Sequence, residues 1–442
     1  MPRLFYRLYS YFVAVALLGT PALHAEMPSL TLDELVGEAL ERNPELKFYE
    51  AEIAAVRGAR SQAGTLPNPE LNAEIGGKSV RDLGGNKLGD GPVWSVSVAQ
   101  TFEFPGRVSL RKAIADRQIG LARLGLDQFR AALANRIRQL GFRAMAAEQK
   151  AEASAEVAER FQDLLSVLVQ RDPAGVAPLI DTRIIEANML TLERRAAQTE
   201  QERQAALFEL NQLRGVPIAT PVRVERTPLH LDPPPGLARL IASAREKNFA
   251  VRTRIAELEQ QGFKVRLAAN ERWPSVTVAP YWAGEQASDK QREWGLGISL
   301  PLPLWDQKHG HIAAARARQL QAEVLLNVTL RETERALAVA EHSYRTQLEE
   351  MRKWRGDEIQ RFREAAALGD HHYRLGALPI STYTELQKQY LDALDTVLGT
   401  QLDALTSRSE LEYLIGQPLG VATSVETASV GPAGAREKGA RQ

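Results

Sequence analysis

The chain has 442 residues, and 55 Lys and Arg balance 55 Asp and Glu, so its formal net charge is zero. A nucleic-acid-binding protein would need a basic excess to neutralise phosphates, so this balance argues against that class. The absence of cysteine excludes disulfides, thiolate catalysis, zinc–thiolate sites and cysteine lipidation. As a prior, the length favours about three compact domains.

Residues 1–25 are typical of a secretory signal peptide, so the mature chain is expected to be exported. Arg3 and Arg7 supply the positive start, 11–18 is a short apolar run, and Ala25 ends a suitable cleavage site. An uncleaved anchor is the alternative, but the run is short for a bilayer. Beyond it, no apolar stretch reaches the roughly 18 residues of a transmembrane helix, which predicts a periplasmic protein or one held in the outer membrane by β-strands.

The mature chain is predicted to contain two copies of one unit, because three blocks of residues recur in the same order. We expect a first repeat over 26–217, a Pro-rich linker over 218–236, a second repeat over 237–418 and a disordered tail over 419–442. Each repeat would hold a helix, two strands and a long helical hairpin. Recurring pairs include Leu32 and Leu237, Asn43 and Asn248, Pro69 and Pro274, Trp94 and Trp294, Gly175 and Gly376, Pro178 and Pro379, and Gly215 and Gly416.

Long proline-free stretches predict long helices in both halves. They cover 106–172 and 179–216, then 304–378 and 380–417. Apolar residues recur within them at spacings of three and four, which is typical of bundled helices. A helix over the first stretch would be on the order of 100 Å long, so the prior of compact domains must be wrong. Three such stripes are Leu126, Phe129, Leu133, Ile137 and Leu140; Leu337, Ala340, Tyr344, Leu348 and Met351; and Leu391, Leu394, Leu398, Leu402 and Leu405.

Each half carries a predicted hairpin turn between its two long helical stretches. Gly175 and Pro178 mark the first turn, and Gly376 and Pro379 mark the second. Glycine adopts the left-handed geometry that ends a helix, and proline suits the first turn of the next helix. We therefore expect two helical hairpins per chain.

Four segments of alternating apolar and polar residues lie between the helical stretches and predict β-strands. They cover 70–75, 94–102, 275–282 and 293–302. Each is close to the length of about 9–11 residues with which a tilted strand crosses a bilayer. A soluble sheet covering one face of the helices is the alternative that alternation alone leaves open.

Tryptophans and polar loops favour the membrane interpretation. Trp94, Trp282 and Trp294 are expected at the ends of their strands, as an interfacial aromatic girdle would be, and 78–92 and 284–292 are expected to be extracellular loops. Four strands cannot close a membrane barrel of at least eight, so several protomers would have to contribute.

Several motifs resemble the TolC-like outer-membrane factor family, especially the CzcC-like heavy-metal efflux branch. The most specific is 297–318, in which strand, double proline and helix start follow the order found in the family. The other matching segments are 41–46, 62–71, 99–107, 373–376 and 410–416. Together they are distributed along nearly the whole mature chain.

The resemblance implies an α+β membrane protein: a TolC-type trimeric β-barrel with four strands from each protomer, continued by a long α-helical barrel. It implies a passive efflux duct in the outer membrane of a Gram-negative bacterium, with its helices in the periplasm. Its partners would be two further copies, an inner-membrane pump of the resistance-nodulation-division class, a periplasmic adaptor (membrane fusion) protein and outer-membrane lipid. Many relatives carry a lipidated cysteine, and this chain is expected to be unlipidated.

The resemblance points to heavy-metal cations as cargo. Drugs or proteins secreted by a type I system are the alternative cargo, and a periplasmic helical scaffold or adaptor is the alternative class of protein. Deletion followed by metal and drug sensitivity testing would separate the cargoes.

Acidic residues that follow the hairpin turns are candidates for a periplasmic gate. In some TolC relatives such residues ring the entrance after the second turn, where this chain has Thr382 and Glu385. The first half offers Asp181 at the position equivalent to Thr382. Asp181 and Glu385 are therefore the gate candidates, since rings of like charge attract cations. The alternative is that they are solvated carboxylates favoured by the helix dipole.

No catalytic motif is found, so the chain is not expected to be an enzyme, and no cofactor or metal site is predicted. Two histidine pairs, His309 with His311 and His371 with His372, are candidate metal ligands. Exposed histidines near turns are commoner than metal sites, so neither pair is assigned a metal.

Overall fold

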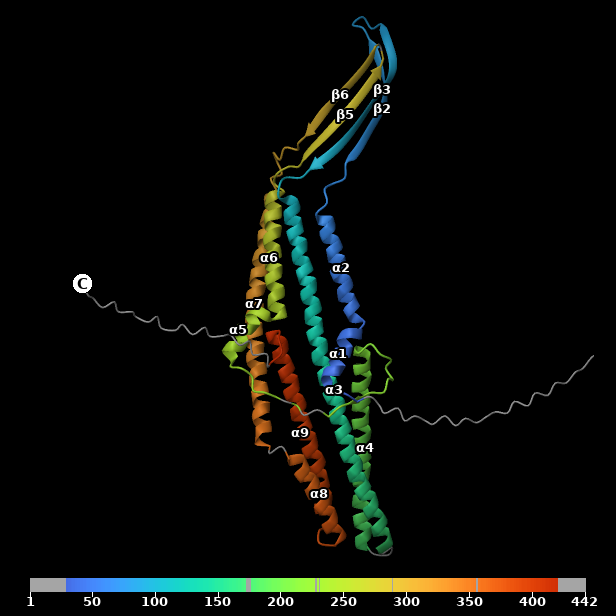
Figure 1. Cartoon of the computed structure of the whole chain (residues 1–442), viewed down its shortest axis with the longest axis vertical. Helices are drawn as coiled ribbons and strands as arrows, with labels where there is room; N and C mark the ends of the chain where they lie inside the picture. The colour runs from blue at the N-terminus through green and yellow to red at the C-terminus, as the bar shows by residue number, and fades with distance from the viewer. Residues whose placement is uncertain are drawn as a thin grey trace, which may run out of the picture.

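The computed structural model describes residues 29–171, 176–226, 229, 231–287, 289–354 and 357–419. The expected signal peptide, Gly175 and all but the first residue of the expected tail lie outside these residues. The molecule is elongated, with a four-stranded sheet at one end and two helical hairpins at the other (Figure 1). In chain order the elements are β1 (Ser29–Leu30), α1 (Leu32–Arg42), α2 (Glu45–Ala63), β2 (Glu70–Arg81), β3 (Lys87–Phe102), α3 (Arg107–Arg171), α4 (Val176–Leu213), β4 (Arg223–Val224), α5 (Leu237–Lys247), α6 (Phe249–Asn270), β5 (Val276–Gln286), β6 (Lys290–Ser299), α7 (His309–Lys353), α8 (Glu358–Arg374) and α9 (Ile380–Ile415).

The first long helix agrees with the prediction, and the third does not. α3 has 65 residues, close to the proline-free stretch from which it was predicted. The single helix expected over 304–378 is instead split into α7 and α8, because α7 ends before Trp354, whose backbone is extended. Gly356, a poor helix former, follows in the sequence. α7 also begins later than predicted, at His309 rather than 304, because a non-helical connection after Pro303 precedes it.

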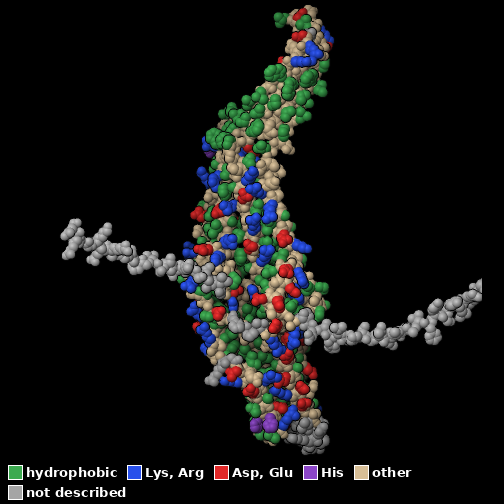
Figure 2. Space-filling model, viewed as in Figure 1, with side chains coloured by type: hydrophobic (Ala, Val, Ile, Leu, Met, Phe, Trp, Pro, Cys, Tyr) green, Lys and Arg blue, Asp and Glu red, His purple; other side chains and the backbone are tan. Residues whose placement is uncertain are grey.

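The apolar stripes that predicted bundling pack into helix–helix cores. Ile137 of α3, Leu210 of α4 and Leu35 of α1 are fully buried in one cluster, which also includes residues of α9. Leu337 and Tyr344 of α7 are fully buried in a second cluster with residues of α5 and α9. The helices are therefore held by narrow seams along their length, while charged side chains cover their outer surfaces (Figure 2). None of the described helices combines the length and the apolar character needed to cross a membrane.

The four predicted strands form one antiparallel sheet in the order β2-β3-β5-β6. They are longer than expected. β2 and β3 remain paired as far as Arg81 and Lys87, and β5 and β6 as far as Gln286 and Lys290, so most of 78–92 and 284–292 is strand. The polar and glycine-rich sequence misled the prediction, because ladder hydrogen bonds join backbone groups and tolerate such residues.

At the end of the sheet that is nearer the helices, β6 is shorter than expected. β6 ends at Ser299, although the alternation continues through Leu300 and Leu302. Pro301 and Pro303 lack the backbone N–H that a ladder needs, so pairing stops there.

A second, two-stranded parallel sheet joins the start of the described chain to the linker. β1 pairs with β4, placing Ser29 opposite Arg223 and Leu30 opposite Val224. The backbone N–H of Glu225 also donates to the carbonyl of Leu30 at 2.8 Å. The segment expected to be only a stiff linker therefore contains a strand, which anchors it to the helical body.

Candidate functional site

One face of the four-stranded sheet is apolar and exposed. In antiparallel pairs, residues opposite each other project to the same face, and alternate residues along a strand share that face. Ile75 is 88% exposed and Trp294 is 80% exposed, and they belong to a contiguous apolar patch of the kind that marks an interaction or membrane surface. Figure 2 shows hydrophobic side chains gathered over the sheet, in contrast to the charged helical surface. This face comprises Leu71, Ile75, Trp94, Val98, Val276, Trp282, Trp294, Leu296 and Ile298.

Three tryptophans mark one level of this apolar face. Trp282 lies opposite both Trp294 and Val96, and Trp94 is two residues beyond Val96 on the same face. The prediction that these tryptophans end their strands is wrong, because β3, β5 and β6 all continue past them. The Trp94 ring covers Gly284, where an added Cβ would come within 2.8 Å of the ring atoms.

A second aromatic group lies where the sheet meets the helices. Phe104 stacks on Trp273 with ring centroids 5.5 Å apart, and the Arg272 guanidinium lies 5.6 Å from the Trp273 ring. An extended chain from Trp94 to Phe104 spans about 33 Å, or about 25 Å of height at a strand tilt near 40°. This height matches the apolar band of membrane barrels, which is about 25 Å tall.

The other face of the sheet is polar and carries several carboxylates. Glu70 and Glu74 of β2, Glu285 of β5 and Glu293 of β6 alternate with the apolar set. Lys78 Nζ lies 2.7 Å from Glu285 Oε1, so one of these charges is neutralised. The remaining carboxylates give the polar face a negative character.

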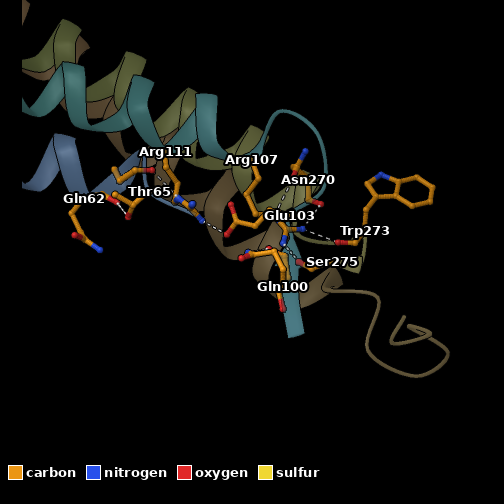
Figure 3. Close-up of polar contacts among 11 residues, drawn as sticks. Gln62, Thr65, Gln100, Glu103, Arg107, Arg111, Asn270, Trp273 and Ser275 are labelled. Atoms are coloured by element: carbon orange, nitrogen blue, oxygen red, sulfur yellow. Dashed lines mark hydrogen bonds and ion pairs between the residues drawn. The ribbon is translucent and has the colours of Figure 1, made fainter. Parts of the chain in front are cut away.

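A hydrogen-bond cluster centred on Arg107 fixes the sheet to the helices (Figure 3). Gly106 has φ of +88°, which places Arg107 at the start of α3 with its guanidinium aimed at the α6–β5 connection. Arg107 Nη2 donates to the carbonyl of Trp273 at 2.7 Å, and Nη1 donates to Ser275 Oγ at 3.0 Å. Nε donates to Asn270 Oδ1 at 3.1 Å.

A third connection joins the same cluster. Arg111 Nη1 lies 2.5 Å from Glu103 Oε1, and Arg111 Nε donates to the carbonyl of Ala63 at the end of α2. Glu103, Gly106 and Arg107 all belong to the 99–107 motif that carries the family resemblance. The motif therefore has a structural reason: it joins α2, the β3–α3 link and the α6–β5 link.

At the other end of the molecule, Asp181 lies in the contact between the two hairpins. Asp181, in the first turns of α4, accepts a 3.3 Å hydrogen bond from the hydroxyl of Tyr373 of α8. The Tyr373 ring stacks on Tyr383 of α9 at 5.2 Å, and Tyr383 in turn packs edge-on against Phe161 of α3. Asp181 is thus bonded across the hairpins through residues that sequence reasoning missed.

Glu385 has a different environment. It is exposed, as is Thr382, and its carboxylate accepts a 3.0 Å hydrogen bond from Gln389 of the same helix. The structure therefore places both gate candidates near the hairpin tips but brings only Asp181 into the inter-hairpin contact. Gly376, with φ of +73°, and Pro379, which precedes α9, lie in the turn between α8 and α9, while Pro178 lies within α4.

Burial controls the protonation of Tyr383 in this contact. Tyr383 is fully buried, and burial, followed by the charge of Asp370, raises the pKa of its hydroxyl well above the usual range. The hydroxyl therefore stays protonated and donates to Asp370 Oδ1 at 3.3 Å. Arg374 Nε lies 2.8 Å from Asp370 Oδ2, which completes the group. In the sequence, only the 373–376 family motif indicated that this hydrogen-bonded group is important.

The histidine pairs are exposed and lie apart from any acidic cage. His371 and His372 have ring centroids 5.9 Å apart, and His309 Nε2 lies 3.0 Å from Gln307 Oε1. Among the described residues, no group of three or more His, Asp or Glu side chains is placed to hold a metal ion.

Comparison with known proteins shows what this chain is similar to. The outer membrane efflux protein family matches residues 35–216. The chain is 22% identical to the pyoverdine export outer membrane protein OpmQ of Pseudomonas aeruginosa, covering 87% of this chain and 85% of that protein. It is 27% identical to the cobalt-zinc-cadmium resistance protein CzcC of Cupriavidus metallidurans, covering 67% of this chain and 69% of that protein.

A solved structure has the same fold over nearly the whole length. The CmeC outer membrane channel of Campylobacter jejuni matches with a TM-score of 0.69 at 14% identity, covering 94% of each chain. The predicted resemblance to the TolC-like outer-membrane factor family is therefore confirmed, and the chain has the fold of an outer-membrane efflux channel.

Proposed function

We propose that this protein is the outer-membrane duct of a tripartite efflux system, which passively carries substrate from an inner-membrane pump to the exterior. The observation that carries the proposal is the sheet, which has an exposed apolar face of membrane height and a polar face behind it. A periplasmic scaffold or adaptor would have no use for such a face. In this proposal the chain catalyses no reaction.

The duct is a homotrimer. β2 and β6 are the two edges of the sheet, and each pairs on one side only within the described chain. Four strands cannot enclose a pore, whereas three copies joined edge to edge would supply a 12-stranded barrel, with the polar faces lining the pore. The helices then continue the tube into the periplasm, where the hairpin tips meet an adaptor and a pump of the resistance-nodulation-division class. The barrel lies in the outer membrane of a Gram-negative bacterium and carries no lipid anchor.

Each protomer consists of two repeats, 26–217 and 237–418, joined by the linker 218–236. Equivalent contacts support this organisation. Asn43 Nδ2 donates to the carbonyl of Leu213 at 2.8 Å, and Asn248 Nδ2 donates to the carbonyl of Leu414 at 2.7 Å. In both halves the asparagine thus ties a short-helix junction to the end of the hairpin.

We assign heavy-metal cations as the cargo. CzcC, a relative by sequence, is a cobalt-zinc-cadmium resistance protein, and the excess of carboxylates on the polar face suits a cation path. A second cargo class is supported by OpmQ, which is named for pyoverdine export and covers more of the chain. If the cargo is not a metal cation, the alternative is a duct for drugs or for type I protein secretion.

Asp181 and Glu385 are the proposed gate residues at the periplasmic entrance. Asp181 would act by holding the two hairpins together through Tyr373, and Glu385 would act through its exposed charge. Replacing Asp181 with Asn should increase channel conductance by loosening the contact, whereas replacing Glu385 with Gln should change cation preference with little effect on opening. Equal conductance for both variants and the wild-type channel would remove the gate assignment.

Deletion of the gene, with complementation by the wild-type chain, tests the function directly. We expect lower tolerance to cobalt, zinc or cadmium and a heat-resistant trimer in outer-membrane extracts. Recovery of the chain as a soluble periplasmic monomer would disprove the duct. Unchanged metal tolerance together with greater drug sensitivity would overturn only the choice of cargo.

A further inference from the structure

Two basic side chains extend the apolar face of the sheet beyond its tryptophan level. Lys290 and Arg292 begin β6, at the end of the sheet far from the helices. Alternation from Trp294 places both of them on the apolar face, and both are exposed. Arg292 lies about 7 Å beyond Trp294 along the strand, and Lys290 lies about 13 Å beyond it. That is where the headgroups would begin, if the tryptophans mark the interface.

The surroundings leave these two charges without a protein partner. Opposite them on β5, on the same face, are Gly284 and Gln286, which carry no charge. Asp90, the carboxylate on the corresponding part of β3, is paired with Lys87. Among the described residues neither Lys290 nor Arg292 forms an ion pair, and Glu293, which follows Arg292, projects to the opposite face.

We propose that Lys290 and Arg292 form a lipid-phosphate clamp, which binds the phosphate groups of anionic lipids in the outer leaflet around the barrel. The inference rests on the proposed function, because it takes the apolar face to be in contact with lipid. Arginine and lysine are the side chains that pair with phosphate oxygens, and their aliphatic stems can extend along apolar surface while the charge reaches the headgroup. Trp294 and Leu296 below them would contact the acyl chains of the same lipid.

The clamp also explains an asymmetry within the sheet. The polar face, which lines the proposed pore, has an excess of carboxylates, whereas the outer rim of β6 is basic. Opposite charges on the two faces of one strand suit opposite tasks: one attracts cations to a pore, and the other holds anionic headgroups outside it.

Quenching of tryptophan fluorescence by brominated lipids tests the clamp, since Trp94, Trp282 and Trp294 lie on the same face. The full chain is reconstituted in phosphatidylcholine containing either brominated phosphatidylcholine or brominated phosphatidic acid. We expect the wild-type protein to prefer phosphatidic acid. The variant K290Q/R292Q should lower that preference at least fivefold, because one cation at an anionic surface contributes about fivefold to binding.

Two further variants serve as controls. K290R/R292K keeps both charges and should retain the preference. R316Q/R318Q removes two exposed arginines with the same spacing from α7, outside the sheet, and should also retain it. If K290Q/R292Q keeps the wild-type preference, or if R316Q/R318Q loses it equally, the clamp is disproved. If no brominated lipid quenches the wild-type protein, the sheet is not in contact with lipid, and the proposed function fails along with the clamp.

Discussion

Replacing Arg107 with Ala should loosen the joint between the sheet and the helices. The guanidinium donates four hydrogen bonds to the α6–β5 connection: to Asn270 Oδ1, the Asn270 carbonyl, the Trp273 carbonyl and Ser275 Oγ. A hydrogen bond from a charged donor contributes about 1.5–3 kcal/mol net, and the bonds of one side chain are not additive. Counting two of the four as independent, we expect the substitution to lower the free energy of unfolding by about 3–6 kcal/mol.

A matched control lies on the same two helices. Arg117 of α3 pairs with Glu259 of α6 at 3.1 Å, but both side chains are 47% exposed. An exposed pair of this kind contributes under about 1 kcal/mol. Arg117→Ala therefore removes an α3–α6 contact made by the same kind of side chain without removing the half-buried Arg107 cluster.

Urea unfolding and hydrogen exchange of the full chain in detergent measure both effects. Arg107→Ala should lower the unfolding midpoint and should selectively reduce amide protection around 103–110 and 270–278. Arg117→Ala should do neither to a comparable degree. If the two variants lower the free energy of unfolding equally, or if Arg107→Ala lowers amide protection uniformly along the chain, the assignment of Arg107 as the joint is wrong.

Three further predictions concern the helical body. Tyr373→Phe removes one hydrogen bond to Asp181, worth roughly 1 kcal/mol, so the open state should become about fivefold more populated in single-channel recordings; an unchanged open probability would contradict the contact. Gly416→Ala should destabilise the protein far more than Gly376→Ala in thermal melts: both glycines have positive φ, but an added Cβ would lie 2.2 Å from the Lys247 carbonyl oxygen at Gly416 and would meet nothing within 4 Å at Gly376. Burial raises the pKa of Tyr344 to about 12. The contribution of this hydroxyl to the free energy of unfolding should therefore be fully present below pH 10 and should be lost as pH rises from about 10 to 12. Tyr344→Phe should abolish the loss of stability over this pH range. If the variant and the wild-type protein have the same stability profile against pH, the assignment to Tyr344 is wrong.

Local pattern was enough to predict most of the long helices and the four strands of the larger sheet. The stripe from Leu126 to Leu140 follows helical periodicity, and the alternation from Leu71 to Ile75 follows strand periodicity, so both elements could be assigned without tertiary information. The residues that pack between helices could also be predicted from the sequence, since a residue such as Leu337 is apolar on an otherwise polar helix. These features depend on a residue and its near neighbours along the chain.

Tertiary structure decided where strands end, where helices break and which side chains meet. The hairpin ladders continue through glycines and polar residues because the partner strand supplies their hydrogen bonds, so the tryptophans lie within strands rather than at their ends. The sequence singles out Asp181 as a gate candidate and Arg107 as part of a family motif, but it does not reveal the hydrogen-bond partners of either residue. Their partners Trp273 and Tyr373 are far away along the chain, and only the packing of α3 against α6 and of one hairpin against the other brings them within hydrogen-bond distance.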